Sequence, residues 1–132
     1  MRYLIDTQIL IWAMINPEKL SKQTIEILKN NNIFISQISL FEIAIKQKIG
    51  KLPDFTLSIN ALVELMNQNS FNILPITTQH IETYHAIPLL ENHRDPFDRL
   101  LLAIAMSENM PIISADANFV HYISHIQLIK NE

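Results

Sequence analysis

Four carboxylates carry most of the chemistry that this chain can offer. Each occurs where a run of apolar residues gives way to the start of a predicted helix, at Asp6, Glu42, Asp98 and Asp116. Carboxylates gathered in one place repel one another and resist ionising unless a cation joins them. Because a set of oxygen ligands suits hard cations, the four acids predict a shared site for a divalent metal ion.

Basic residues accompany the acids. Lys46 lies one helical turn after Glu42, and Arg94 and Arg99 lie on either side of Asp98. Lysine and arginine bind phosphate oxygens without by themselves selecting a base sequence. We interpret these three residues as candidate phosphate contacts beside the metal site. The alternative for Lys46 is an ordinary ion pair with the acid four residues before it.

Each acid also has a purely structural interpretation. Ser39 and Glu42 have the spacing of a capping box, and Asp95, followed by proline, has the pattern of a residue that caps a helix. Asp98 is redundant as a cap because Asp95 already supplies one. Asp6 lies in a strongly apolar segment, where an unpaired charge is costly. These two observations favour a catalytic or metal-binding role for Asp98 and Asp6 in addition to capping.

Composition excludes several classes of function. The net charge of -3 and the pI near 5.9 argue against a protein that coats nucleic acid by bulk electrostatics, for which a pI above about 9 is usual. The only glycine is Gly50, which excludes glycine-rich phosphate loops and dinucleotide fingerprints. The absence of cysteine excludes disulfides and favours a reducing compartment, hence the cytoplasm. The first apolar run, residues 3–15, is too short and too interrupted for a membrane span, so no membrane association is expected.

Histidine offers a weaker route to a metal site. His121 and His125 have a helical spacing and His80 lies near His85, but no His-Glu-x-x-His pattern occurs. A zinc site is therefore disfavoured. Catalysis by a Ser-His-Asp triad is also disfavoured, because the Gly-x-Ser-x-Gly elbow is absent. We expect His93 at the surface.

Strands and helices alternate along the 132 residues. The expected strands are 2–6, 33–38, 71–76, 110–114 and 126–129, and the expected helices are 7–15, 21–30, 39–49, 58–69, 77–86 and 95–109, with a turn or short helix at 116–119. This alternation predicts one α/β domain of three layers with a mainly parallel sheet. Sites in such sheets form beyond the carboxyl ends of the strands, so the four acids are expected to converge there.

Four segments together resemble the PIN-domain ribonucleases, and within them the VapC-like toxins of type II toxin-antitoxin pairs. The segments are Leu4-Ile5-Asp6-Thr7, Ser36 to Lys46 with Gly50-Lys51-Leu52, His93-Arg94-Asp95-Pro96-Phe97-Asp98-Arg99-Leu100-Leu101 and Ser114-Ala115-Asp116. They cover nearly the whole chain in the family's order. The resemblance implies a single PIN-like α/β/α sandwich over residues 1–132 and an endoribonuclease that depends on Mg²⁺ or Mn²⁺. It also implies a homodimer and inhibition by a cognate small antitoxin protein.

The resemblance assigns the family's four acids to Asp6, Glu42, Asp98 and Asp116. We expect all but Glu42 to bind one or two metal ions, and Glu42 to be either a ligand or the residue that orients the attacking water. A metal-activated water would attack an RNA phosphodiester. The resemblance implies that this hydrolysis leaves 5′-phosphate and 3′-hydroxyl ends.

Lys46, Arg94 and Arg99 are the candidate RNA contacts in this mechanism. The sequence departs from the subgroup at two places, with Gln8 where histidine is common and Ser114 where threonine is usual. Neither departure removes a carboxylate, but the hydrogen bonding around the first and fourth acids is expected to differ.

Two other functions stay open. A phosphatase of the haloacid-dehalogenase type also has an aspartate after its first strand, but it needs a second aspartate where this chain has Gln8. A non-catalytic module that binds RNA or protein would keep the fold and show no metal-dependent activity.

Overall fold

The computed structural model describes all 132 residues around a central sheet of five strands. The strands are β1 (Arg2–Ile5), β2 (Asn32–Ser36), β3 (Asn72–Leu74), β4 (Ile112–Ser114) and β5 (Leu128–Lys130). Their order across the sheet is β3-β2-β1-β4-β5, and every neighbouring pair is parallel. The predicted mainly parallel sheet is therefore confirmed, and it contains no antiparallel strand.

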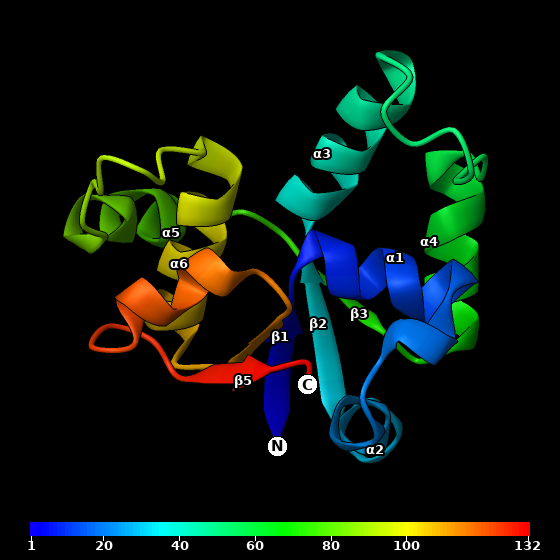
Figure 1. Cartoon of the computed structure of the whole chain (residues 1–132), viewed down its shortest axis with the longest axis horizontal. Coiled ribbons are helices and arrows are strands. Elements are labelled where there is room, and N and C mark those ends of the chain that lie inside the picture. Colours follow the sequence, from blue (N-terminus) through cyan, green and yellow to red (C-terminus); the bar gives the residue numbers. More distant parts are fainter.

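Helices cover both faces of this sheet. They are α1 (Thr7–Ile15), α2 (Lys22–Asn30), α3 (Gln37–Lys48), α4 (Ile59–Gln68), α5 (Thr78–Thr83) and α6 (Pro96–Glu108), with 3-10 helices η1 (Pro17–Lys19), η2 (Tyr84–Ala86) and η3 (Ala117–Tyr122). Figure 1 shows α1 and α4 on one side of the strands and α5 and α6 on the other. The predicted α/β/α sandwich is confirmed.

Two apolar cores result from the alternation of side chains along the strands. Ile5 and Ile113 point into the core that α1 and α4 cover, whereas Leu4 and Ile112 point into the core that α6 covers. All four side chains are fully buried. Strands that are buried on both faces read as continuous apolar runs, which is why the sequence shows them so clearly.

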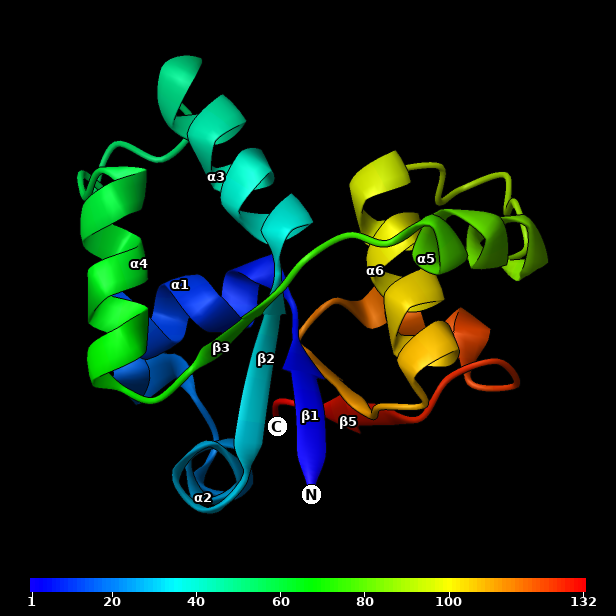
Figure 2. The same ribbon diagram turned by 180° about the vertical axis from the view of Figure 1, so that it is seen from behind.

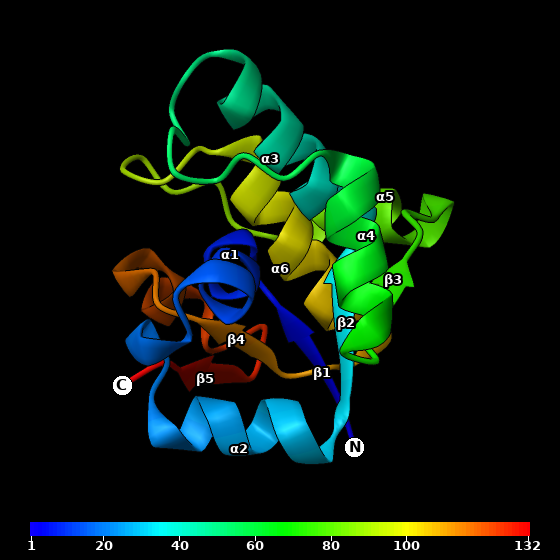
Figure 3. The same ribbon diagram turned by 90° about the vertical axis from the view of Figure 1, so that its right-hand side faces the viewer.

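The carboxyl ends of β1 and β2 lie at the edge of the sheet from which α3 rises (Figures 1 and 2). Seen from the side, α3 stands at one end of the molecule and α2 runs along the other (Figure 3). Phe41 of α3 meets Phe97 of α6 edge to face, with ring centroids 6.2 Å apart. The space between α1, α3 and the start of α6 thus lies directly beyond the strand ends.

The start of α3 differs from the prediction. The helix begins at Gln37, and the hydroxyl of Ser36 accepts from the backbone N–H of Ile38 at 3.1 Å. The predicted capping box of Ser39 and Glu42 is therefore wrong, and both side chains are free to turn into the protein.

Other boundaries shift by a few residues. The strand expected at 110–114 begins after Pro111, which has no backbone N–H to pair, and the strand expected at 126–129 starts at Leu128. The helix expected at 77–86 changes to a 3-10 helix after Thr83.

None of the helices combines the length and the apolar content that crossing a bilayer requires.

Candidate active site

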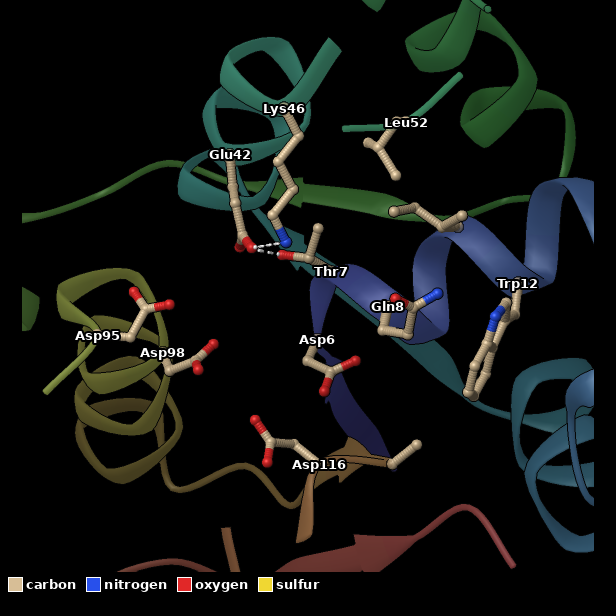
Figure 4. Close-up of a pocket in the computed structure, with 12 residues that line it drawn as sticks. Asp6, Thr7, Gln8, Trp12, Glu42, Lys46, Leu52, Asp95, Asp98 and Asp116 are labelled. Carbon is tan, nitrogen blue, oxygen red and sulfur yellow. Dashed lines mark hydrogen bonds and ion pairs between the residues drawn. The ribbon is translucent and has the colours of Figure 1, made fainter. Parts of the chain in front are cut away.

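A cleft of about 280 Å³ opens beyond the carboxyl ends of β1 and β4. Asp6 follows β1, Asp116 follows β4, Glu42 projects from α3 and Asp98 from the first turn of α6. Figure 4 shows the four carboxylates around this common space. The structure therefore brings together all four acids that the sequence singled out, although they are up to 110 residues apart in the chain, as Asp6 and Asp116 are.

Asp6 is the most buried of these acids, with 5% of its surface exposed. One carboxylate oxygen accepts from the backbone N–H of Ile9 at 2.9 Å and so caps α1, and the other accepts from the hydroxyl of Ser114 at 2.5 Å. Burial raises the pKa of Asp6 from 3.8 to about 7, although both hydrogen bonds oppose the rise. The charges of Asp98 and Asp116 add to it. Asp6 therefore both caps α1 and lines the candidate active site.

Ser114 connects the first acid to the fourth. Besides donating to Asp6, its hydroxyl oxygen accepts from the backbone N–H of Asp116 at 2.9 Å. Asp116 in turn accepts from the N–H of Asn118 at 2.9 Å and caps η3. The hydroxyl of Ser114 thus links the carboxylate of Asp6 to the backbone of Asp116.

Asp98 is held by a buried histidine. The Nε2 atom of His93 lies 3.1 Å from a carboxylate oxygen of Asp98, and its Nδ1 atom lies 2.8 Å from the hydroxyl of Tyr122. Both contacts are satisfied when Nε2 donates to the carboxylate and Nδ1 accepts from the tyrosine. Burial raises the pKa of Asp98 to about 6, against the lowering effect of the His93 hydrogen bond. His93 is only 6% exposed, so its predicted surface position is wrong.

The donor set fits a divalent cation. A nitrogen of His93 and one carboxylate oxygen each of Asp98 and Asp116 lie within 4.8 Å of one another, and with both of its nitrogens in hydrogen bonds the histidine supports the carboxylate ligands. Asp6 adds carboxylate oxygens from the same cleft (Figure 4). Burial and mutual repulsion raise the pKa of two of these carboxylates, and a bound cation relieves both effects. The three aspartates supply the hard oxygen ligands that Mg²⁺ and Mn²⁺ prefer.

Glu42 differs from the three aspartates because it already has a cationic partner. Lys46 lies 2.8 Å from one of its oxygens, and the hydroxyl of Thr7 donates to the other at 2.8 Å. Ser39 lies 2.9 Å from the Thr7 hydroxyl, which has one proton and therefore accepts from Ser39 while it donates to Glu42. The ion pair of Lys46 and Glu42, which the sequence left as an alternative, is present.

The three basic residues proposed as RNA contacts have different surroundings. Lys46 lines the cleft but has its ammonium group on Glu42. Arg94 is exposed and makes no ion pair. Arg99 is 4% exposed, donates to the backbone carbonyl of Ile87 at 2.7 Å and to the hydroxyl of Tyr84, and does not line the cleft. The buried guanidinium of Arg99 is already used in hydrogen bonds within the protein, which does not support its predicted contact with RNA.

Residues 3–123 match a protein-family model, which is described as PIN domain. This chain belongs to the PIN domain family. A comparison with curated protein sequences found no match.

Solved structures share the fold of this PIN domain at low sequence identity. A chain of VapBC2 from Rickettsia felis bound to a DNA fragment from their promoter superimposes with a TM-score of 0.74 at 19% identity, over 100% of both chains. A chain of VapBC-1 from nontypeable Haemophilus influenzae gives 0.67 at 20% identity, over 98% of both chains. A chain of VapBC-5 from Mycobacterium tuberculosis, a member of the VapBC family of toxin-antitoxin systems, gives 0.64 at 17% identity, over 98% of this chain and 96% of that one.

Two residues that support the acids of this PIN domain were not singled out from the sequence. Thr7 holds Glu42, and Tyr122 holds the histidine that contacts Asp98. The role of Thr7 has a weak sequence signal, since it directly follows an acid at a strand end. Tyr122 has none, because its partners depend on how η3 folds back over α6.

Proposed function

We propose that this protein is a divalent-metal-dependent endoribonuclease and the toxin of a type II toxin-antitoxin pair, with residues 1–132 as its single nuclease domain. One observation supports the proposal most strongly. Four carboxylates from four separate elements converge in one cleft of a PIN domain, and burial raises the pKa of two of them. If these four carboxylates had only a structural role, the protein would gain nothing from bringing them together, because their charges repel one another.

Asp6, Asp98 and Asp116 would hold Mg²⁺ or Mn²⁺, one ion or two. When bound, the ion supplies Lewis-acid chemistry, which makes a water molecule more acidic and neutralises charge that develops on the phosphate. His93 keeps the Asp98 carboxylate in position, and Ser114 does the same for Asp6. Fixed side chains of this kind keep the ligands from having to reorganise when the ion binds.

Glu42 would orient the attacking water or serve as a further ligand. Its two oxygens already accept from Thr7 and Lys46, so a contact with water would use the remaining lone pairs. Lys46 would shift toward the RNA backbone as the substrate enters, and Arg94 would contact it from the exposed rim. Contacts of this kind position RNA without reading its sequence.

A cognate antitoxin is supported by the proteins that share the fold, which come from VapBC complexes. A hollow of about 510 Å³ between α1, α2 and the segment that precedes β3 would suit an apolar segment of such a partner. The apolar side chains that line it are Ala13, Met14, Pro17, Leu20, Ile25, Leu28 and Phe71.

We also propose a cytoplasmic homodimer, and the 59% exposure of Phe41 is consistent with an interface over α3.

The test compares amide substitutions at two acids. Asp98→Asn and Glu42→Gln keep size and most hydrogen bonds but remove the charge, so both should lose cleavage of RNA in Mn²⁺ by at least about 100-fold, the scale on which catalytic groups act. Glu64→Gln, an exposed position on α4, is the matched control. Equal rates for the parent and the Asp98→Asn protein would refute the proposal, provided that both proteins melt at similar temperatures.

A further inference from the structure

The cleft that holds the acids continues into a second hollow of about 190 Å³. The two hollows share Gln8, Ile11, Trp12 and Leu52 as lining residues, which makes them one continuous surface. Figure 4 shows Trp12 and Leu52 on the side of the space away from Asp95 and Asp98. The cleft therefore has an acidic half and a half with aromatic and apolar side chains.

Two side chains of the second half, those of Trp12 and Leu52, suit neither a cation nor a phosphate. Trp12 and Leu52 are half-buried and rest against the apolar core, but each keeps surface in both hollows. An indole and an aliphatic side chain offer no ligand to a metal ion and no charge to a phosphodiester. They match a flat, weakly polar group that enters the cleft together with the phosphate.

We propose that Trp12 is the stacking platform for an unpaired nucleobase next to the bond that is cut. This inference rests on the proposed nuclease function and adds a binding subsite to it. Bases that are not stacked in a helix are commonly bound on aromatic side chains, and the face of an indole accepts any base. Ile11 and Leu52 would pack against the base, and the amide of the exposed Gln8 can both donate to and accept from its edge.

The surroundings of the ring supply positive charge for the backbone of the same nucleotide. The ammonium group of Lys19 lies over the Trp12 ring, 5.7 Å from its centroid, and Lys51 lines the second hollow together with Asp54. The four acids line the other hollow. An RNA strand bound across both would have the scissile phosphate near the four acids and its neighbouring phosphate near Lys51. A duplex keeps its bases paired, so this subsite selects single-stranded RNA.

Trp12 is the only tryptophan in the chain, so its fluorescence reports on this subsite alone. The full-length Asp98→Asn protein is titrated with a short single-stranded RNA and, separately, with an abasic ribose-phosphate oligomer of equal length. Anisotropy of a dye on each oligomer measures occupancy independently. The RNA should quench the tryptophan emission, whereas the abasic oligomer at equal occupancy should leave it nearly unchanged.

The other outcomes overturn the inference in distinguishable ways. Bound RNA without quenching, or equal quenching by both oligomers, would show that no base stacks on Trp12. Either result would leave the nuclease proposal intact. Emission that changes with protein concentration alone would place the ring in a contact between copies of the chain. No binding of RNA at all would refute the nuclease proposal and this inference together.

Two substitutions in the cleavage-competent protein provide a second test. Trp12→Leu keeps an apolar side chain without an aromatic face, and it should raise KM for single-stranded RNA about tenfold with little change in kcat. Trp12→Phe keeps a face and should stay within about threefold of the parent. Equal KM values for the two variants would contradict stacking. If the leucine variant does not fold, the fluorescence titration still decides, because it uses the unaltered ring.

Discussion

Replacing Asp6 with asparagine should stabilise the metal-free protein at pH 8. The carboxylate is 5% exposed, and burial raises its pKa from 3.8 to about 7. The folded protein therefore keeps a proton on Asp6 at pH values where the unfolded chain has already lost it. Because the folded state binds the additional proton, the free energy of unfolding falls as the pH rises through this window.

The size of the effect follows from the two pKa values of Asp6. A difference of about three pH units corresponds to about 4 kcal/mol of stability that is present near pH 4 and lost by about pH 7. Asp98, whose pKa rises to about 6, contributes in the same direction. An asparagine has no proton to lose, and its carbonyl can still accept from the N–H of Ile9. The Asp6→Asn protein should therefore lose less stability between pH 5 and pH 8.

Urea unfolding in the presence of EDTA measures this directly, at pH 5, 6, 7 and 8. Between pH 5 and pH 7 the slope for the parent should be steeper than that for Asp6→Asn by about 1.4 kcal/mol per pH unit. Asp54→Asn, at an exposed loop position, should keep the parent's slope. Parallel curves for Asp6→Asn and the parent would show that the Asp6 carboxylate is not destabilised by its surroundings.

Mn²⁺ should raise the parent's melting temperature more at pH 8 than at pH 6, because the ion competes with the proton for the same oxygens.

Three further substitutions test separate parts of the structure. His93→Ala should weaken Mn²⁺ binding in calorimetry about tenfold, because a metal-binding carboxylate loses its donor, and Tyr122→Phe should weaken it less. Arg99→Met should lower the free energy of unfolding in urea by about 2 kcal/mol through the loss of two buried hydrogen bonds, whereas Arg94→Met should leave it unchanged and weaken RNA binding. Leu28→Asp should leave RNA cleavage intact and weaken capture of the co-expressed antitoxin, and unchanged capture would exclude the hollow beside α2 as its site.

The architecture follows from local sequence signals that the structure preserves. The apolar pairs Leu4-Ile5 and Ile112-Ile113 are buried on both faces of the sheet, and such segments are readily recognised as strands in the sequence. Acids that follow strand ends in a parallel sheet must lie at one edge, and Asp6 and Asp116 do. Helix starts were less predictable. Ser36 and Ser39 are both good caps, and the choice between them depends on where β2 stops.

The surroundings of the acids could not be predicted in the same way. His93 precedes the helix that carries Asp98, and a surface position was the natural expectation for a histidine flanked by polar residues. It is buried because Tyr122, nearly 30 residues later, supplies a partner for its second nitrogen. Arg99 looks like a phosphate contact in sequence, yet it donates to Tyr84 and Ile87 in the segment before the helix. Partners that lie far away in the chain decided both positions.

The strand order has a consequence for the synthesis of the protein. β1 is made before β4, which is one of its two neighbours in the sheet, and the backbone N–H of Asp6 donates to the carbonyl of Ile113. Until the ribosome has released residues 112–116, one edge of β1 is unpaired and Asp6 lacks both Ser114 and Asp116. Pairing across so long a stretch of chain is slow compared with local folding. A nascent or prematurely terminated chain that lacks residues 112–116 therefore has no complete acidic cleft.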